Sequence, residues 1–437
     1  MNVFIATIGT RGDVQPYVAL GEALHHAGHA VTICTSTRYA ALVAERGLQY
    51  GRLSDDLVAL VETPEGRSAI AAAGGSAGGM RALIRLIRTS FRIQRALFRD
   101  GWTAAQAANP DVVVYHPKMA IALHYAERLG IPAAMATLFP TLLPTSAYPN
   151  PGFPALNLGR RLTAAYNRAT HHLVRTVVSV VSRWLFASWR AEHGLPPQPW
   201  GTGLLHRDDG THVPIVNGWS AHVAPDPPDW PRQDVTTTGY WVLDRRSDWT
   251  PLPALQAFLE AGPPPVYVGF GSMAGGDPAH TTRVVLDALA QAGCRGVLAR
   301  GWGGLDARDC PESVYLLDQV PHDWLFERVA AVVHHGGAGT TAAGLRAGCP
   351  TVVCPFFGDQ LFWARRVCDL GVGPAPVPQK HLTAPRLADA IRQATEHVAM
   401  RQAAATLGRA LRREDGAAQA VSSIERIVAG RRLRRQG

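Results

Sequence analysis

Long apolar runs are missing from this chain of 437 residues. No stretch of about eighteen uncharged apolar residues occurs, so the sequence predicts no transmembrane helix. The first expected strand begins at Asn2 with no basic segment before it, and a secretory signal peptide is not expected. The six cysteines are scattered without any Cys-x-x-Cys pair, which argues against a zinc site or a disulfide framework. We expect reduced thiols and a cytoplasmic protein, at most peripheral to the inner membrane face.

Two nucleotide-binding signals are also missing. The Gly-x-Gly-x-x-Gly spacing of dinucleotide-binding turns does not occur, which argues against a dehydrogenase. The net charge is +9, but the basic residues do not cluster as in a nucleic-acid-binding module and no nucleic-acid motif is present. We therefore expect no nucleic acid partner.

The chain does contain a regular alternation of apolar strands and helices. Short continuous apolar runs between helical segments indicate doubly wound parallel sheets. Proline-rich sequence between 224 and 265 divides this alternation in two. The expected fold class is α/β, with two Rossmann-like domains facing each other across a cleft that binds the ligand. We expect an N-terminal domain at 1–225, a linker at 226–262 and a C-terminal domain at 263–437, whose last helices can cross back to the N-terminal domain.

A short strand, two histidines and a glycine pair form the most informative segment. The apolar strand expected at 330–333 leads into His-His-Gly-Gly at 334–337, and a helix of small residues follows at 338–347. Glycine lets the backbone approach a ligand, and the first amides of a helix are unpaired and carry positive dipole character. An adjacent imidazole adds a hydrogen bond to an oxyanion. The segment therefore predicts a site for an anion such as a diphosphate.

A polar pair follows about twenty residues further on. Asp359 and Gln360 stand at an expected strand-to-helix turn and offer the acceptors and the donor that sugar hydroxyls need. Phosphate binding beside hydroxyl recognition suggests a nucleotide sugar. Metal ligation by the two histidines lacks support, since no Asp, Glu or Cys stands at ligand spacing around them. No Asp-x-Asp pair occurs to hold a divalent ion either, and no metal is expected.

The first strand leads into a turn that carries a candidate base. Gly-Thr-Arg-Gly-Asp at 9–13 follows the strand and opens the first helix. The glycines permit a tight turn, and Asp13 is expected at the carboxyl end of the strand, facing the cleft. A carboxylate there can accept a proton from an incoming hydroxyl. The alternative is a plain helix N-cap, since aspartate is favoured there and Pro16 lies within the first turn.

Weaker signals lie in other loops. Phe-Gly-Ser-Met at 270–273 ends a strand and can touch a phosphate, although Gly-Ser after a strand is usually only a turn. A nucleotide base can lie against the backbone of Val320 and Pro321. Trp324, just after them, is expected to pack in the core rather than to stack on a ligand.

Residues 81–99 have arginines at three- and four-residue steps with Leu, Ile and Phe between them. Such a basic amphipathic helix can lie on anionic lipid. The favoured alternative is a surface helix that packs one face on its own core. The region 140–230 is rich in Pro, Trp and Leu, which suits a pocket for a bulky apolar alcohol.

Taken together, these motifs resemble the family 1 nucleotide-sugar glycosyltransferases, which have the two-domain GT-B fold. The resemblance is closest to the sterol 3-beta-glucosyltransferases of fungi and bacteria. The opening segment is also similar to glycosyltransferases that decorate glycopeptide antibiotics. The resemblance is weak at 55–105 and 140–230, where the family builds its acceptor pocket. The matching segments occur in family order at 9–21, 238–241, 266–273, 320–326 and 334–360.

The resemblance implies roles for single residues. Asp13 matches the carboxylate proposed as catalytic base. Related plant enzymes have a histidine at that turn, so its replacement here argues against a His-Asp dyad. His335 matches the phosphate-binding histidine, and Asp359 and Gln360 should hold the sugar hydroxyls. The other donor contacts are expected from Val320 and Pro321, which border the uracil or thymine, and from Gly12, Gly271, Ser272, Gly337, Ala338, Gly339 and Thr340.

We expect an inverting transfer of a hexose from a UDP-sugar to a hydroxyl of a hydrophobic acceptor such as a sterol. Glucose is the hexose expected first. Asp13 accepts the hydroxyl proton, and His335 with the helix amides stabilises the leaving diphosphate. Neither a metal nor another cofactor is expected. The alternatives are an antibiotic-tailoring enzyme using a TDP-deoxysugar, a non-catalytic nucleotide-sugar-binding partner protein, and a sugar epimerase. Asp13, Asp359 and Gln360 argue against the non-catalytic reading, and the opening segment argues against the epimerase.

Overall fold

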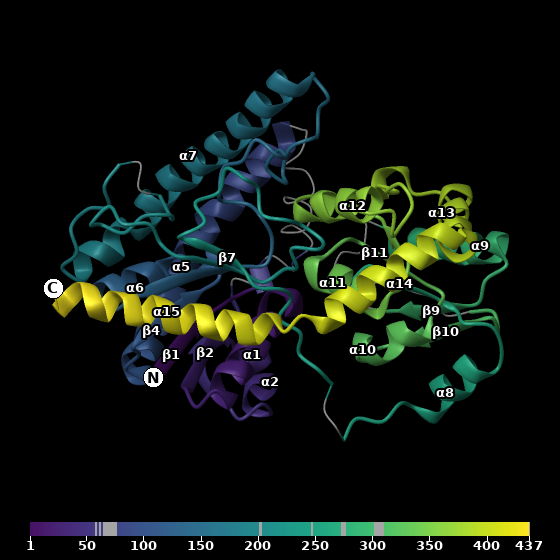
Figure 1. Ribbon diagram of the computed structural model, residues 1–437, viewed down its shortest axis with the longest axis horizontal. Helices are drawn as coiled ribbons and strands as arrows, with labels where there is room; N and C mark the ends of the chain where they lie inside the picture. The colour runs from purple at the N-terminus through teal and green to yellow at the C-terminus, as the bar shows by residue number, and fades with distance from the viewer. Residues whose placement is uncertain are drawn as a thin grey trace.

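The computed structural model describes residues 1–56, 59–60, 63, 77–200, 203–245, 248–271, 277–300 and 310–436, with the backbone alone for 77–92 and 432–436. Within these residues the strands form two parallel sheets (Figure 1). The first has the order β3-β2-β1-β4-β5-β6-β7 and the second β10-β9-β8-β11-β12. The expected α/β class is confirmed. The strands are β1 Asn2–Ala6, β2 Ala30–Ser36, β3 Gln49–Leu53, β4 Val112–Tyr115, β5 Ala133–Thr137, β6 Ile215–Asn217, β7 Val235–Thr237, β8 Val266–Gly269, β9 Gly296–Ala299, β10 Val314–Leu317, β11 Ala331–His334 and β12 Thr351–Val353.

Helices flank both sheets. Short 3-10 turns occupy Thr37–Tyr39, Pro117–Met119, Phe326–Arg328 and Gln379–His381. The α-helices are α1 Arg11–His26, α2 Ala40–Ala44, α5 Ala77–Ala108, α6 Ile121–Leu129, α7 Arg160–Glu192, α8 Pro253–Glu260, α9 Pro278–Ala292, α10 His322–Leu325, α11 Ala338–Ala347, α12 Asp359–Asp369, α13 Ala384–Glu396, α14 Val398–Arg413 and α15 Gly416–Gln436.

Both sheets reverse their strand order beside their first strand. In the first sheet β1 lies between β2 and β4, and in the second β8 lies between β9 and β11. The core strands are continuous apolar runs because helices cover both faces of a parallel sheet, and Phe4 and Val113 are fully buried. Ligands of such sheets bind at the carboxyl ends of the strands, where the order reverses. A ligand site is therefore expected at these two points.

The boundary between the halves differs from the sequence expectation. Strand β7 lies inside the predicted linker at 226–262, yet it pairs with β6 and completes the first sheet. Its three residues are too short to show a period-2 pattern, so the proline-rich surroundings dominated the prediction. Helix α15 leaves the second half and packs along α1 (Figure 1). Ala420 and Ile424 of α15 are fully buried in the same hydrophobic cluster as Tyr17.

The basic segment 81–99 lies within α5, as predicted. Leu97 and Phe98 are buried in the N-terminal core, so the described end of the segment packs on the protein itself. The side chains up to residue 92 lie outside the described part of the chain. Among the described residues, no helix combines the length and the apolar character that a bilayer span requires.

Candidate active site

Asp13 lies at the start of α1, where the loop after β1 turns back on itself. Thr10 is the N-cap, so Asp13 is the third helical residue and not the N-cap that the alternative reading assumed. Asp13 Oδ2 accepts hydrogen bonds from Thr10 N at 2.8 Å and from Thr10 Oγ1 at 3.1 Å. A Cβ on Gly9, which has φ +139°, would lie 2.2 Å from Asp13 Oδ2. The turn therefore needs glycine, and one carboxylate oxygen, Oδ1, stays available for other partners.

Two residues that follow the neighbouring strand β4 lie close to Asp13 Oδ1. His116 and Lys118 follow β4, whose end lies beside the end of β1. Lys118 Nζ lies 2.7 Å from Asp13 Oδ1, and His116 Nε2 lies 3.6 Å from it. Neither residue was among the sequence candidates. The available signal was a His-Pro-Lys run directly after an apolar strand, but only the strand order shows that β4 neighbours β1.

The surroundings hold Asp13 in its ionised form. Burial favours the neutral carboxyl, but the positive Lys118, the His116 ring and the hydrogen bonds from Lys118 and Thr10 together hold the pKa of Asp13 below its ordinary value. Burial lowers the pKa of His116 to about 3, so this ring is neutral at neutral pH. His116 Nδ1 accepts a hydrogen bond from Lys118 N at 3.0 Å, which leaves the ring proton on Nε2, toward Asp13. The turn at Asp13 has no histidine of its own, but His116, which follows β4, lies beside the aspartate.

The second half brings His335 to the amino end of α11. A Cβ on Gly271 would lie 3.2 Å from the His335 ring and a Cβ on Gly337 only 2.6 Å, so both glycines leave room for the imidazole. Burial lowers the pKa of His335 to about 4, and its Nδ1 is buried without a hydrogen-bond partner in the described structure. Gly337 is the N-cap of α11. The first amides of α11, which have no intrahelical partner, belong to Ala338, Gly339 and Thr340. These are the residues for which the sequence predicts an anion site.

Asp359 and Gln360 open α12, the next helix along the sheet. Gln360 is buried, and its Oε1 accepts hydrogen bonds from the backbone N–H groups of Phe356 at 2.8 Å and Phe357 at 3.4 Å. The side-chain oxygen of Gln360 therefore holds the loop in place, and only the side-chain nitrogen is left for a sugar hydroxyl. The sequence could not show this restriction. Burial, with the negative charge of Asp13 nearby, raises the pKa of Asp359 to about 6.

The loop before α10 faces the start of α1. Arg11 Nη1 donates to Gln319 Oε1 at 3.4 Å across the two halves. Val320 and Pro321 follow in this loop and are partly exposed, as residues that border a base would be. Trp324 is buried against Trp249, with ring centroids 5.2 Å apart, so the expected packing role is confirmed.

Two sequence candidates remain. Gly12 is exposed in the first turn of α1, and a Cβ there would meet only Thr10 Oγ1, at 3.8 Å. Ser272 lies outside the described residues. Among the described residues, no group of three His, Cys, Asp or Glu side chains is placed to hold a metal ion.

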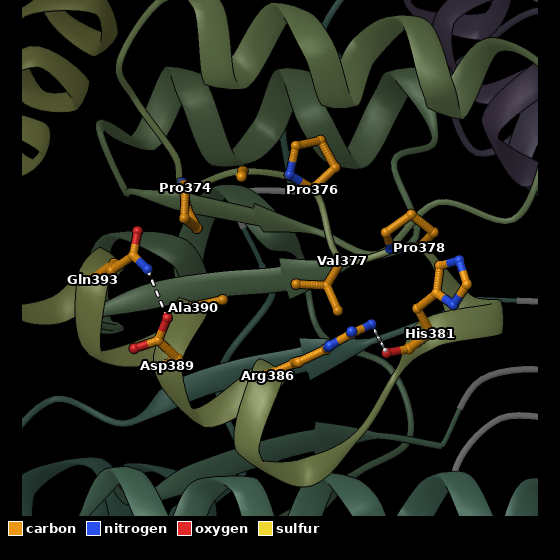
Figure 2. Close-up of a pocket in the computed structure, with 10 residues that line it drawn as sticks. Pro374, Pro376, Val377, Pro378, His381, Arg386, Asp389, Ala390 and Gln393 are labelled. Atoms are coloured by element: carbon orange, nitrogen blue, oxygen red, sulfur yellow. Dashed lines mark hydrogen bonds between the residues drawn. The ribbon is translucent and has the colours of Figure 1, made fainter. Parts of the chain in front are cut away.

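Asp13, His116 and Lys118 thus face the second half of the molecule, where Asp359 lies within electrostatic reach of Asp13 and α11 contacts α1. A separate cavity of about 280 Å³ lies between the proline-rich segment at 374–378 and α13 (Figure 2). Its polar groups pair with each other: Arg386 donates to the His381 carbonyl at 3.3 Å and Gln393 to Asp389 at 2.9 Å. This cavity shares no residue with the candidate site.

Comparison with known proteins agrees with this geometry. Residues 3–148 match the glycosyltransferase family 28 N-terminal domain, and 284–425 match the erythromycin biosynthesis protein CIII-like C-terminal domain. The glycosyltransferase of kitacinnamycin has the same fold, with a TM-score of 0.69 and 21% identity over 98% of each chain. The calicheamicin glycosyltransferase CalG4 also shares it, with a TM-score of 0.67 and 20% identity over 98% of each chain. The protein is therefore a glycosyltransferase with the GT-B fold.

Its sequence relatives are more specific. The chain is 34% identical to a sterol 3-beta-glucosyltransferase of Arabidopsis thaliana, over 98% of this chain and 68% of that protein. A second A. thaliana enzyme of the same name is 35% identical, over 97% of this chain and 65% of the relative. The Candida albicans sterol 3-beta-glucosyltransferase is 34% identical over 97% of this chain, which spans 27% of that longer protein. The chain belongs to this family of nucleotide-sugar glycosyltransferases.

Proposed function

We propose that the protein transfers glucose from UDP-glucose to the hydroxyl of a hydrophobic polycyclic alcohol such as a sterol, with inversion at the anomeric carbon. The observation that carries the proposal is the placement of an ionised Asp13 opposite the amino ends of α11 and α12, within electrostatic reach of Asp359. A proton acceptor thereby faces the groups suited to a sugar diphosphate. The sterol glucosyltransferase relatives support the acceptor class.

In the proposed reaction the acceptor oxygen attacks the anomeric carbon while its proton passes to Asp13. The bond from that carbon to the diphosphate breaks, and the nucleoside diphosphate leaves with the electron pair from the opposite face. An α-linked donor thus gives a β-linked product. His335 and the first amides of α11 stabilise the charge that develops on the leaving group. Because the pKa of Asp13 is lowered, the carboxylate is a weak base, so orientation supplies much of the rate and proton transfer is late.

A donor-by-acceptor screen with product detection by mass spectrometry tests the proposal. UDP-glucose and TDP-glucose are each combined with a sterol, a flavonoid and a macrolide, and the sterol with UDP-glucose is expected to react best. Asp13→Asn is the control and should lower kcat by about 10²- to 10⁴-fold while sparing donor binding. Transfer only to glycopeptides or aminoglycosides would overturn the acceptor class. A variant that kept most of its kcat would leave Asp13 as a capping residue.

A second candidate function differs in the nucleotide of the sugar donor. A neighbouring structure with a TM-score of 0.61, the glycosyltransferase SsfS6, is complexed with thymidine diphosphate. A TDP-deoxysugar donor and an antibiotic-like acceptor form this second candidate. Preference for TDP-sugars and macrolides in the same screen would select it.

Independence from metal ions is the third part of the proposal. It is supported by the amino end of α11, whose amides and adjacent His335 offer positive potential to a diphosphate without a cation. We expect full activity in EDTA. Activity that disappears in EDTA and returns with Mg²⁺ or Mn²⁺ would contradict this part and leave the rest of the proposal unchanged.

A further inference from the structure

The loop that follows β5 is held by hydrogen bonds to two other parts of the first half. Asp229, which precedes β7, accepts hydrogen bonds from Thr145 Oγ1 at 2.8 Å, from Ser146 N at 2.8 Å and from Ser146 Oγ at 3.0 Å. On its other side, the buried Asn167 of α7 donates from Nδ2 to the Ser146 carbonyl at 2.9 Å. Hydrogen bonds to a carboxylate are among the stronger ones in proteins, so the middle of this loop has a defined position.

Tyr148 of the same loop reaches the second half of the molecule. The buried His171 of α7 donates from Nε2 to the Tyr148 carbonyl at 3.1 Å, which fixes the backbone at this residue. The Tyr148 ring packs against Phe362 of α12, with ring centroids 5.1 Å apart and an angle of 62° between the planes. Edge-to-face aromatic pairs of this kind contribute more than the apolar area they bury. Phe362 is buried in the same hydrophobic cluster as Leu143 of the loop, so the two halves share a core here.

Phe362 belongs to the helix that carries the two predicted sugar-binding residues. Asp359 and Gln360 are the first residues of α12, and Phe362 follows Asp359 by three positions, which places both on the same side of the helix. Arg366, one turn further on, donates from Nε to the Val223 carbonyl of the first half at 2.9 Å. One side of α12 is therefore seated on the first half, and Asp359 lies at the amino end of that side.

We propose that Tyr148 is a positioning residue through which the loop after β5 sets the sugar-binding end of α12. Strand β5 pairs with β4, and β4 is followed by the residues that contact Asp13, so the loop begins at the edge of the sheet that holds the candidate base. Tyr148 acts through Phe362 and not on the reacting atoms. The inference rests on the proposed function, in which Asp359 and Gln360 bind the hexose of the donor.

The two parts of the donor should respond differently to a displaced α12. The nucleoside diphosphate is proposed to bind at His335 and the amino end of α11, away from the contact between Tyr148 and Phe362. Only the hexose is proposed to depend on α12. Loss of the Tyr148 ring should therefore weaken the binding of a nucleotide sugar and spare the binding of the free nucleotide, whereas a general loss of structure would weaken both.

Isothermal titration calorimetry with UDP and with UDP-glucose, without acceptor, measures this difference. Tyr148→Ala should raise the Kd for UDP-glucose by roughly 3- to 10-fold, the size of an aromatic pair, and leave the Kd for UDP unchanged. Tyr148→Phe retains the ring and should bind both ligands like the unmodified chain. Tyr315→Ala is the matched control, because Tyr315 makes a similar contact with Phe258, with ring centroids 5.5 Å apart, on the edge strand β10 at the far side of the second sheet.

Two results with folded variants would overturn the proposal. One is a Tyr148→Ala variant whose two Kd values change equally or not at all. The other is a Tyr148→Phe variant as weak as Tyr148→Ala, since the ring would then not be the cause. If circular dichroism shows that Tyr148→Ala is unfolded, Phe362→Leu gives the same comparison from the side of α12, with the same selective loss expected.

Failure of the proposed function gives a different result. A chain that binds UDP-glucose with the expected dependence on Tyr148 but transfers glucose to no sterol would contradict the proposed acceptor and leave the role of Tyr148 standing. A chain that binds only TDP-sugars would contradict the proposed donor, and the same titrations with TDP and TDP-glucose would then test Tyr148. Binding of neither nucleotide sugar by the unmodified chain would overturn both proposals.

Discussion

Lys118 controls the candidate base at the scale of single residues. Its ammonium contacts Asp13 Oδ1 at 2.7 Å and is one of the reasons that the pKa of Asp13 is lowered. This contact keeps the carboxylate ionised and oriented, but it also makes the carboxylate a weaker base. The same ammonium occupies the oxygen that an acceptor hydroxyl must reach. Lys118 is therefore a positioning residue whose removal has opposite effects on ionisation and on access.

We predict that Lys118→Met moves the acidic limb of the pH profile of kcat/KM to higher pH. Without the ammonium the pKa of Asp13 rises, so the base is protonated, and inactive, over a wider acidic range. The KM for the sugar donor should change little. The control Lys118→Arg retains the charge and should retain most of the original profile. Superimposable profiles for Lys118→Met and the unmodified enzyme would show that the contact has no effect on the base.

Asp359 is an ionisable residue whose burial works against stability. Its pKa in the folded protein is about 6, against an ordinary value of 3.8. Because the folded state holds the proton more tightly, this residue stabilises the fold below pH 3.8. That contribution disappears as the pH rises through about 6. At neutral pH Asp359 carries a negative charge in a largely buried place. Such a carboxylate can accept hydrogen bonds from the hydroxyls of a bound sugar.

Asp359→Asn should therefore stabilise the unliganded protein at pH 7.5, by about 2 kcal/mol, and much less at pH 4.5. The melting temperatures of both proteins at the two pH values give the comparison. The same variant should lose activity with UDP-glucose, because it replaces one acceptor oxygen by an N–H donor and removes the negative charge that strengthens hydrogen bonds from sugar hydroxyls. A stability difference that is equal at both pH values would show that ionisation is not its cause.

At the scale of elements, the phosphate site depends on how β11 meets α11. Gly336 has φ +94°, and a Cβ there would lie 2.7 Å from Val353, so the chain turns sharply between the strand and the helix. This turn brings the His335 ring and the first amides of α11 to the same edge. The segment was recognisable from sequence because strand, glycines and helix follow each other without interruption, and local geometry alone brings the donors together.

We predict that His335→Ala weakens the binding of free UDP by about 1.5–3 kcal/mol, or roughly 10- to 150-fold in Kd, through loss of a hydrogen bond to a charged oxygen. Isothermal titration calorimetry with UDP and with TDP gives the values. His381→Ala, at an exposed histidine of the other cavity, is the matched control and should bind normally. Unchanged affinity of His335→Ala for both nucleotides would remove the histidine from the site.

At the scale of the whole molecule, α15 ties the end of the chain to its beginning. Ile424 is fully buried with Tyr17 and Val18 of α1, although the helix follows directly from α14 of the second half. A helix that crosses between the halves limits how far they can separate, and it contributes core to the domain that holds Asp13.

Ile424→Ala should lower the free energy of unfolding of the N-terminal half by about 2–5 kcal/mol, because it leaves a cavity under α15. Denaturant unfolding followed by intrinsic fluorescence measures the change. Val398→Ala is the control: Val398 is exposed at the start of α14, and its loss should change stability by less than about 0.5 kcal/mol. If both variants unfolded alike, α15 would not be part of the N-terminal core.

The sequence by itself determined the features that depend on neighbouring residues. Continuous apolar runs between helices predicted two parallel sheets, and the glycines around His335 predicted an anion site, since both follow from local spacing. Only the tertiary structure decided which loops meet. The order of strands brought His116 and Lys118 to Asp13, and the contact between the two halves brought Asp359 within reach of the same charge. The tertiary structure also shows that the side-chain oxygen of Gln360 accepts a hydrogen bond from the loop that precedes α12. No local pattern encodes these pairings, because they arise from the packing of segments far apart in the chain.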